Sequence, residues 1–509
     1  MSWLVDARSC PGVFYGTLAQ DGFLIRLRIP AGLLNCLQIQ AIAQLVESWD
    51  IDNVQITNRA NLQVRGVQVV PSQEAFQTLQ ALGLAAQVPE MDHLRNLMTS
   101  PTAGIDPQEW VDPRPLVQAI DAYLQNHPEL AVLSPKFSIG IDGGGSVGIG
   151  CRSPVAWEHR YNDMQFSAMR LDASASALTG LAPGLYWRLA LAVDKRLQDT
   201  SVWIASNQCL PVVAALIQVY RAYIATHPQT EKPPRLQHLL QDWGIADYLQ
   251  RVSQHLGYPL KAVTNFPELP ASQPYAHLGV HPQRQVGLSY LGVSPILGRL
   301  TTVQLLGLAQ LVDTFGSGEL RLTPWQTLVL PNIPSDRVRE VGAHLVALGL
   351  AESEDLSTRG PAIVACAGKP GCGKAATQTQ AHGQILAHSL NQQLLNQQLT
   401  LDAPINIHLT GCPKSCAQAS PAQVTLLGTL IEQPESQVEG YHVYWGDDHN
   451  SLQQWLGEFP FTEIPALVAQ LLPLYQQHRQ RSHHILQEVL QQNVGMGGNA
   501  DCQDDQGRG

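Results

Sequence analysis

The stretch QIQAIAQLVESWDIDNVQITNRANL, residues 38–62, recurs later in the chain as QLLGLAQLVDTFGSGELRLTPWQTL, residues 304–328. The two segments align without a gap at an offset of 266 residues, and seven positions are identical. Each copy follows a strand-like run that ends near a proline, FLIRLRIPAG in the first and VGLSYLGVSP in the second. A chance likeness between two α/β units is the alternative, but seven identities in one ungapped window favour an internal duplication.

Each copy has the pattern of a strand, an amphipathic helix, a turn and a second strand. Ile39, Ile42 and Val46 follow helical spacing, and apolar residues stand at the equivalent places of the second copy. The closing runs NVQIT and ELRLT alternate apolar and polar residues, as half-buried strands do. We therefore predict an α/β (α+β) fold built from two related halves.

A weaker similarity links the runs that start at Leu133 and Ala403, each a strand, a glycine-containing turn and another strand. Each half is therefore expected to hold a small αβ unit and a larger α/β unit. A proline-rich stretch separates the halves, and the C-terminus is rich in Gly and Asp. The predicted division is as follows: small paired units 10–75 and 278–345, first larger α/β unit 76–264, linker 265–277, second larger unit 346–475, and C-terminal helix with disordered tail 476–509.

The composition is that of a globular enzyme-sized protein. Of the 509 residues, 44% are hydrophobic and 14% charged, and the net charge of -11 argues against a nucleic-acid partner. The longest apolar run, from Pro211, is short and interrupted by Arg221, so no membrane span is expected. Nine cysteines, an odd number, argue against a disulfide framework and for metal binding or catalysis. A cytoplasmic protein is the resulting expectation.

Four of the cysteines form two close pairs, Cys366 with Cys372 and Cys412 with Cys416. Both pairs follow apolar strand-like runs, PAIVA and INIHLT, and both lie in glycine-containing turns. Four thiolates brought together by two turns are what a 4Fe-4S cluster requires, and backbone amides at the glycines would tune its potential. A structural zinc and unliganded thiols remain as alternatives, although zinc sites usually have shorter C-x₂-C loops.

The spacing Cys-x₅-Cys then Cys-x₃-Cys, in ACAGKPGC and TGCPKSC, resembles the cluster motif of the siroheme-dependent nitrite and sulfite reductase family. The stretches ITNRANLQVRGV, HLRNLMTSPTAGID and SPKFSIGIDGG are similar to three further motifs of that family, in its order. The likeness covers roughly residues 10–475. It implies a nitrite/sulfite reductase-like fold of pseudo-twofold duplicated halves, with paired ferredoxin-like half-domains and a 4Fe-4S-binding domain in the second larger unit.

The resemblance also implies a carboxylate-rich tetrapyrrole beside the cluster, in a pocket lined by Arg and Lys. Guanidinium groups suit carboxylates because they donate two parallel hydrogen bonds. The positions that match the family motifs are Arg59, Arg95 and Lys136, with Arg65 as a fourth.

Two positions depart from the reductases of this family. Lys414 stands in the second cysteine pair where an Asn is usual, and Ser138 replaces a second Lys of the sulfite reductases. GCPKSCA, residues 411–417, resembles instead the signature of the precorrin-3B synthase branch of the superfamily. That resemblance implies a cobalamin-pathway monooxygenase that hydroxylates precorrin-3A with dioxygen and closes a γ-lactone, with Lys414 meeting a carboxylate of the tetrapyrrole substrate.

Precorrin-3B synthase is accordingly the predicted function, and a siroheme-dependent ferredoxin nitrite or sulfite reductase is the alternative. A non-enzymatic electron-transfer or scaffold protein of the same fold is a third reading. The expected cofactors are a 4Fe-4S cluster, an additional non-haem iron whose ligands the sequence does not reveal, and siroheme under the alternative. Ferredoxin or an NADH-linked reductase is the expected electron donor.

Overall fold

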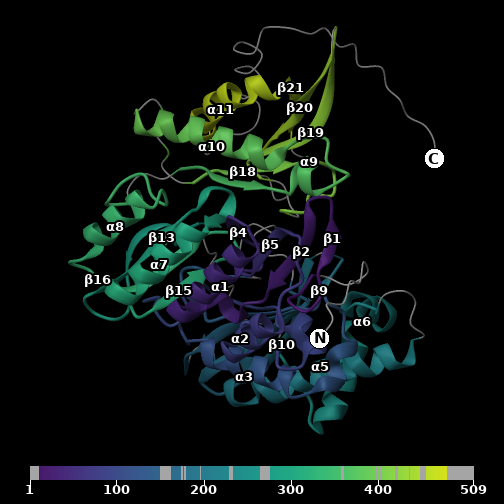
Figure 1. Cartoon of the computed structure of the whole chain (residues 1–509). Helices are drawn as coiled ribbons and strands as arrows, with labels where there is room; N and C mark the ends of the chain where they lie inside the picture. Colours follow the sequence, from purple (N-terminus) through teal and green to yellow (C-terminus); the bar gives the residue numbers. More distant parts are fainter. Residues whose placement is uncertain are drawn as a thin grey trace.

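The computed structural model describes residues 11–149, 162–173, 176, 179–194, 196–227, 233–263, 275–356, 360–396, 399, 401, 404–418, 422–434, 436–446 and 454–478. Its strands form four sheets, each covered by helices (Figure 1). Apart from 275–277 and 476–478, the expected linker and C-terminal tail lie outside the described residues.

The two copies of the repeat form two similar half-domains. The first contains β1 (Thr17–Ala19), β2 (Gly22–Leu27), β3 (Leu33–Asn35), α1 (Cys36–Ser48), β4 (Asn53–Ile56), β5 (Leu62–Val67) and α2 (Gln73–Ala81). The second contains β12 (Gly279–Pro282), β13 (Leu288–Val293), β14 (Arg299–Thr301), α7 (Thr302–Phe315), β15 (Glu319–Leu322), β16 (Leu328–Pro334) and α8 (Val338–Ala347). This arrangement confirms the predicted duplication.

The half-domains exchange a strand with each other. The sheet order is β1-β2-β5-β4-β14 in one and β12-β13-β16-β15-β3 in the other, so β14 completes the first sheet and β3 the second. Side chains of α1, α7 and both sheets belong to one continuous hydrophobic core, which includes Ile42, Val46, Leu308 and Val312. Neither half-domain therefore has a complete sheet or core of its own.

One identical residue of the repeat, a glutamine, has the same structural role at the starts of α1 and α7. Asn35 and Thr301 are the N-caps, and each forms a capping box with a glutamine, Gln38 or Gln304. Each glutamine also donates from Nε2 to a carbonyl near the end of the next helix, at 2.8 Å in the first copy and 3.0 Å in the second. The recurring glutamine thus ties two helices of its half-domain together.

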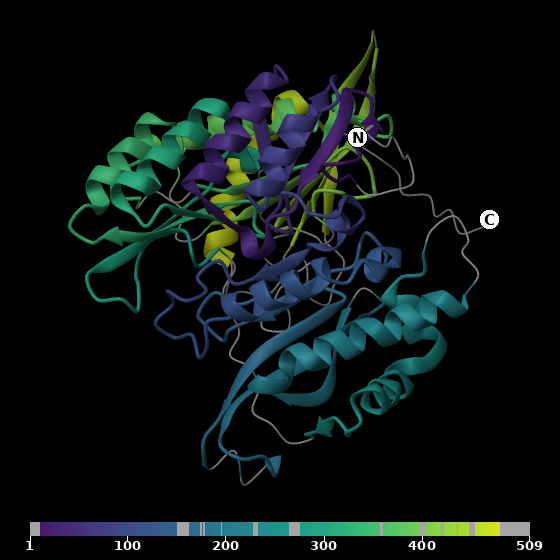
Figure 2. The same cartoon turned by 60° about the horizontal axis from the view of Figure 1, so that its bottom comes forward.

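Each half-domain is followed by a larger sheet. The first, in the order β11-β10-β9-β8-β7-β6, lies at the bottom of Figure 1 and comes forward in Figure 2, with helices packed against it. Its elements are β6 (Leu97–Thr99), α3 (Arg114–Gln125), β7 (Ile139–Asp142), β8 (Met164–Leu171), β9 (Gly184–Val193), β10 (Arg196–Ala205), α5 (Cys209–Thr226), α6 (Leu236–Leu256) and β11 (Lys261–Ala262).

The second larger sheet has the order β17-β18-β19-β20-β21 and lies at the top of Figure 1. In both larger sheets three parallel strands are followed by antiparallel ones. The elements of the second unit are β17 (Ala362–Ala365), α9 (Gly368–Gly371), α10 (Thr379–Leu395), β18 (Asn406–Thr410), β19 (Val424–Gln433), β20 (Ser436–Trp445), β21 (Gln454–Pro460) and α11 (Ile464–His478).

One described helix is long and apolar enough to cross a membrane, residues 206–226, which includes α5. It is a core helix of the first larger unit. Val212, Leu216 and Tyr220 are fully buried within that core, where they pack with residues of α3 and α6. Its apolar composition is therefore accounted for by packing inside the protein.

Candidate active site

The sheet topology brings the two cysteine pairs together. β17 and β18 are parallel neighbours, so their carboxyl ends lie at the same edge of the sheet. Cys366 follows β17 directly, and Cys372 follows the short helix α9. Cys412 and Cys416 lie in the turn after β18. All four cysteines line one cleft with a volume of about 670 Å³.

The backbone already supplies one hydrogen bond to a thiol of this site. Gly411 donates its N–H to Cys366 Sγ at 3.2 Å, across the two cysteine loops. The hydroxyl of Thr379, on α10, lies 3.5 Å from the same sulfur. The N–H bond to sulfur is of the kind that stabilises a thiolate and tunes the reduction potential of an iron-sulfur cluster. The Thr379 hydroxyl donates its proton to the Cys366 carbonyl, at 2.8 Å.

The described residues contain no preformed site for a single metal ion. Among the described residues, no three His, Cys, Asp or Glu side chains converge on a point that could hold one. A tetrahedral zinc needs its ligands within about 2.3 Å of one centre. The described residues therefore show no ligand set for the expected non-haem iron. The preference for a 4Fe-4S cluster over zinc continues to rest on the spacing of the cysteines.

Six cationic side chains of the described residues line the same cleft, and four of them come from the first half-domain. Along β2 and just after it, Arg26 and Arg28 line the cleft while Ile25 and Leu27 are fully buried on the other face. On β5, Arg65 lines the same cleft. Sequence reasoning missed Arg26 and Arg28, although their alternation with buried residues in FLIRLRIPAG is the period-two signal of one strand face.

Arg59 and Lys136 lie side by side in this cleft, as expected from the motifs that contain them. Arg59 Nη1 donates to the Lys136 carbonyl at 3.3 Å. Arg235, which sequence reasoning also missed, lies 3.6 Å from the carboxylate of Asp163. Burial raises the pKa of Asp163, although Arg235 and Arg59 act in the opposite direction. Asp163 is the only carboxylate among the described lining residues, against six cationic side chains.

Two predicted substrate-binding residues lie elsewhere in the structure. Arg95 is 5% exposed and makes two 3.1 Å bonds with the Asp121 carboxylate, on the wall of a separate cavity of about 160 Å³. Lys414 is exposed and is not among the residues that line the cleft. Its expected contact with a carboxylate in the cleft is therefore absent from this arrangement, because the turn directs it to the surface.

The second half-domain contributes one described residue to the cleft, Gln326. It occupies the turn 323–327, which repeats the turn 57–61 around Ala60. In both turns the first residue is a threonine, whose N–H donates to the carbonyl of the last residue and whose Oγ1 accepts from the N–H of that residue. Both residues have a positive φ, 53° at Ala60 and 61° at Gln326. Gln326 is 7% exposed and its side-chain Oε1 has no protein partner. Strained backbone of this kind is concentrated at binding sites.

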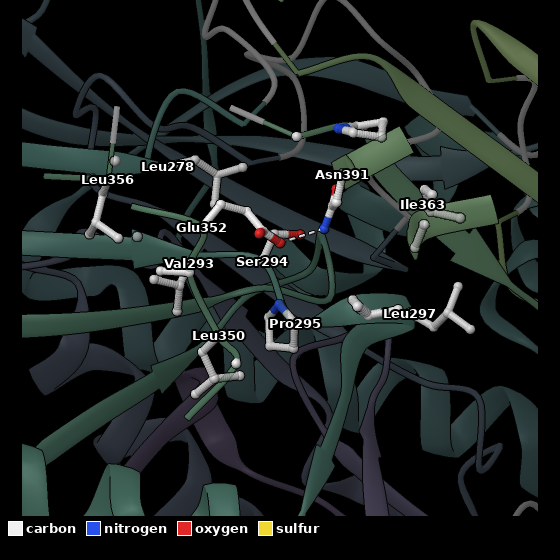
Figure 3. A pocket seen from close by; sticks show the side chains of 18 residues that line it. Leu278, Val293, Ser294, Pro295, Leu297, Leu350, Glu352, Leu356, Ile363 and Asn391 are labelled. Atoms are coloured by element: carbon white, nitrogen blue, oxygen red, sulfur yellow. Dashed lines mark hydrogen bonds between the residues drawn. The ribbon is translucent and has the colours of Figure 1, made fainter. Parts of the chain in front are cut away.

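The second half contains a cavity at the place equivalent to the 160 Å³ cavity of the first half (Figure 3). Its volume is about 100 Å³, and Gly349 and Leu350 line it where Gly83 and Leu84 line the 160 Å³ cavity. Glu352 and Asn391 point toward each other across it and form a 2.5 Å hydrogen bond. No described Cys, Lys or Arg lines this cavity, whereas Arg28, Arg95 and Arg114 line the 160 Å³ cavity that it matches.

Comparisons with known proteins agree with the fold. The family model described as nitrite/sulfite reductase ferredoxin-like half domain matches residues 17–82 and 281–348. The model described as nitrite and sulphite reductase 4Fe-4S domain matches residues 90–260. That segment contains only Cys151 and Cys209, so the four clustered cysteines belong to the other α/β unit.

Several characterised proteins are similar over most of the chain. A ferredoxin–nitrite reductase of Synechococcus elongatus is 32% identical over 91% of this chain and 88% of its own length. A ferredoxin sulfite reductase of Mycolicibacterium paratuberculosis is 30% identical over 83% of this chain and 73% of its own. The solved structure of the Mycobacterium tuberculosis NirA protein has a TM-score of 0.71 at 25% identity, covering 92% of this chain and 83% of that one.

These relatives overturn the prediction of a precorrin-3B synthase. Proteins 26–32% identical over most of the chain are named ferredoxin-dependent nitrite or sulfite reductases. The monooxygenase and cobalamin-pathway expectations are therefore wrong as well. Lys414, the residue that had favoured the synthase, lies outside the cleft wall. The chain is an oxidoreductase, and it belongs to the nitrite/sulfite reductase family of siroheme and 4Fe-4S enzymes.

Proposed function

We propose that this protein is a ferredoxin-dependent nitrite reductase that holds a 4Fe-4S cluster on Cys366, Cys372, Cys412 and Cys416 and siroheme in the adjoining cleft. One observation carries the proposal: a single cleft of about 670 Å³ is lined by all four thiols and by six cationic side chains. A chain with a net charge of -11 gathers those cations at one place, which suits a polyanionic ligand.

The residues of the cleft fit siroheme. Arg26 and Arg235 bring planar guanidinium groups that suit its carboxylates, and Arg59 with Lys136 extends the cationic wall. Arg28 also lines the cleft, but it is 1% exposed and pairs with the buried Asp92 at 3.4 Å. When bound, siroheme supplies the iron at which the substrate anion is reduced, and the cluster supplies electrons to it. The protein's own contribution is to hold these groups side by side and to attract an anion.

Nitrite is favoured over sulfite by the residue at position 138. The resemblance places a second Lys there in sulfite reductases, and this chain has a serine. Ser138 is 1% exposed, and both its N–H and its hydroxyl donate to Asp163, at 3.0 and 3.3 Å. The position therefore offers no charge to a substrate dianion. The 32% identity to a nitrite reductase agrees with this choice.

Ferredoxin as electron donor is supported by the names of the relatives and by surface charge. Three of the seven lysines in the chain lie in the cysteine loops or beside them: Lys369, Lys374 and Lys414. All three are exposed, although Lys369 also pairs with Glu439 at 2.8 Å. Within residues 360–478 they are the only Lys or Arg. A positive rim around the cluster edge suits an acidic electron carrier.

The decisive experiment measures consumption of nitrite and of sulfite by the anaerobically purified protein with reduced ferredoxin. We expect nitrite to be consumed faster than sulfite and the absorption spectrum to show siroheme. A Cys416→Ser variant should lose cluster iron and activity together. Faster sulfite consumption would reassign the substrate, and a protein that purifies without siroheme after co-expression of siroheme synthesis would contradict the proposal.

A further inference from the structure

Two polar side chains of the first half-domain bind the cysteine loops across the domain boundary. Arg65 Nη2 donates to the Gly371 carbonyl at 2.8 Å. Asn58 Nδ2 donates to the Ala417 carbonyl, also at 2.8 Å. Gly371 directly precedes Cys372, and Ala417 directly follows Cys416. The first loop is therefore held at the Gly371–Cys372 peptide group, and the second at the peptide group that follows Ala417.

The guanidinium of Arg65 is itself held in place from the other side. Its Nε and Nη2 each lie 3.0 Å from a carboxylate oxygen of Asp21, in the turn between β1 and β2. A bidentate pair of this kind fixes the plane of the guanidinium. Nη2 thus bridges Asp21 and Gly371, which leaves Arg65 poorly placed to serve as a ligand for a tetrapyrrole carboxylate.

The loop is shaped to receive this side chain. A Cβ added at Gly371 would lie 2.3 Å from Arg65 Nη2 and 2.9 Å from its Cζ, so only glycine permits the contact. Because a trans peptide directs its C=O and N–H to opposite sides, binding of the Gly371 carbonyl also sets the direction of the Cys372 N–H. Backbone N–H groups near the cysteines are the donors that tune a cluster.

We propose that Arg65 and Asn58 are positioning residues, which clamp the two cysteine loops onto the first half-domain and so set the geometry and reduction potential of the cluster. This inference rests on the assignment of the four cysteines as cluster ligands in the proposed function. It replaces the expectation that Arg65 binds the tetrapyrrole.

The test compares four variants of the full-length protein: Arg65→Gln, Gly371→Ala, Asn58→Ala and Gly373→Ala. Gly373 lies in the same loop, and a Cβ there would meet only the end of the flexible Gln20 side chain, at 3.0 Å, so it is the matched control. The readouts are the EPR spectrum of the reduced cluster, its midpoint potential, and the rate of cluster loss in air, none of which depends on the substrate.

We expect Arg65→Gln and Gly371→Ala to shift the EPR spectrum and the midpoint potential in the same way. Cluster loss should be about tenfold faster, the order expected for one lost charge-assisted hydrogen bond. Asn58→Ala should show a smaller shift, and Gly373→Ala none. Wild-type spectra and potentials in both Arg65→Gln and Asn58→Ala would overturn the clamp. If Cys416→Ser kept its cluster, the ligand assignment would fail instead, so the two failures are distinguishable.

Discussion

Glu109 is a carboxyl group that the fold buries at 5% exposure, between the Gly104 N–H, which donates to it at 2.6 Å, and the glycine turn after β7. Burial raises its pKa from 4.5 to about 8. The unfolded carboxyl releases its proton near pH 4.5 and the folded one near pH 8, so stability contributed by the protonated group is lost as the pH rises through this range. We expect a loss on the order of a few kcal/mol.

A Glu109→Gln variant should remove this dependence, because the amide oxygen can still accept from Gly104 and carries no proton that titrates. Its free energy of unfolding, measured in urea, should rise relative to wild type between pH 5 and pH 8. A constant difference between the two proteins across this range would show that Glu109 titrates at an ordinary pKa in the folded state.

The cationic residues show which members of the cleft can be predicted from sequence and which depend on the fold. Arg59 and Lys136 stand in motifs, and the structure places both in the cleft. Arg26 and Arg28 stand in no recognised motif, and only their position on one strand face brings them there. Arg95 turns to Asp121, a partner 26 residues away, and such a choice depends on tertiary packing that a local pattern does not contain.

At the scale of elements, the capping glutamines of α1 and α7 make a direct test of the duplication. Gln38→Ala should remove two side-chain hydrogen bonds, one to the N-cap backbone and one to Leu82, and Gln304→Ala should remove the equivalent pair. We expect each to lower the free energy of unfolding by about 1–2 kcal/mol. Chemical denaturation measures both.

Equal losses in the two variants are expected because the two sites have the same partners. Gln40→Ala is a suitable control, since this exposed glutamine lies within α1 itself and on the side away from the core. A loss in only one variant would mean that the two helix starts no longer contribute equally to the free energy of unfolding. The control should stay within about 0.5 kcal/mol of wild type.

The elements themselves were predictable from the repeat, because strand and helix periodicity are local properties of sequence. The exchange of β3 and β14 between the sheets was not predicted. Each of these strands has three residues and borders a helix, so its pairing partner is decided by how the half-domains dock. For the cysteines, the sequence predicted only that each pair lies in a turn after a strand. The parallel pairing of β17 with β18 is what places those turns together.

For the whole molecule, the distribution of charge decides how an electron donor can approach. The net charge of -11 repels an acidic carrier at long range, and the lysines beside the cysteine loops provide a local attraction. Under the proposed function, ferredoxin-driven turnover should therefore depend on ionic strength. Salt screens both the long-range repulsion and the local attraction, and the local attraction governs docking. Lys374→Glu and Lys414→Glu should each raise the KM for ferredoxin several-fold.

The same substitutions should leave turnover with a small artificial reductant unchanged, because neither lysine lines the cleft. Lys261→Glu is the matched control, an exposed lysine on β11 of the other α/β unit. It changes the net charge by the same amount, so it should reproduce only the long-range part of the effect. Steady-state kinetics over a range of salt concentrations separates the two contributions. An equal rise in KM for all three variants would show that net charge alone governs encounter and that the lysines around the cluster form no docking surface.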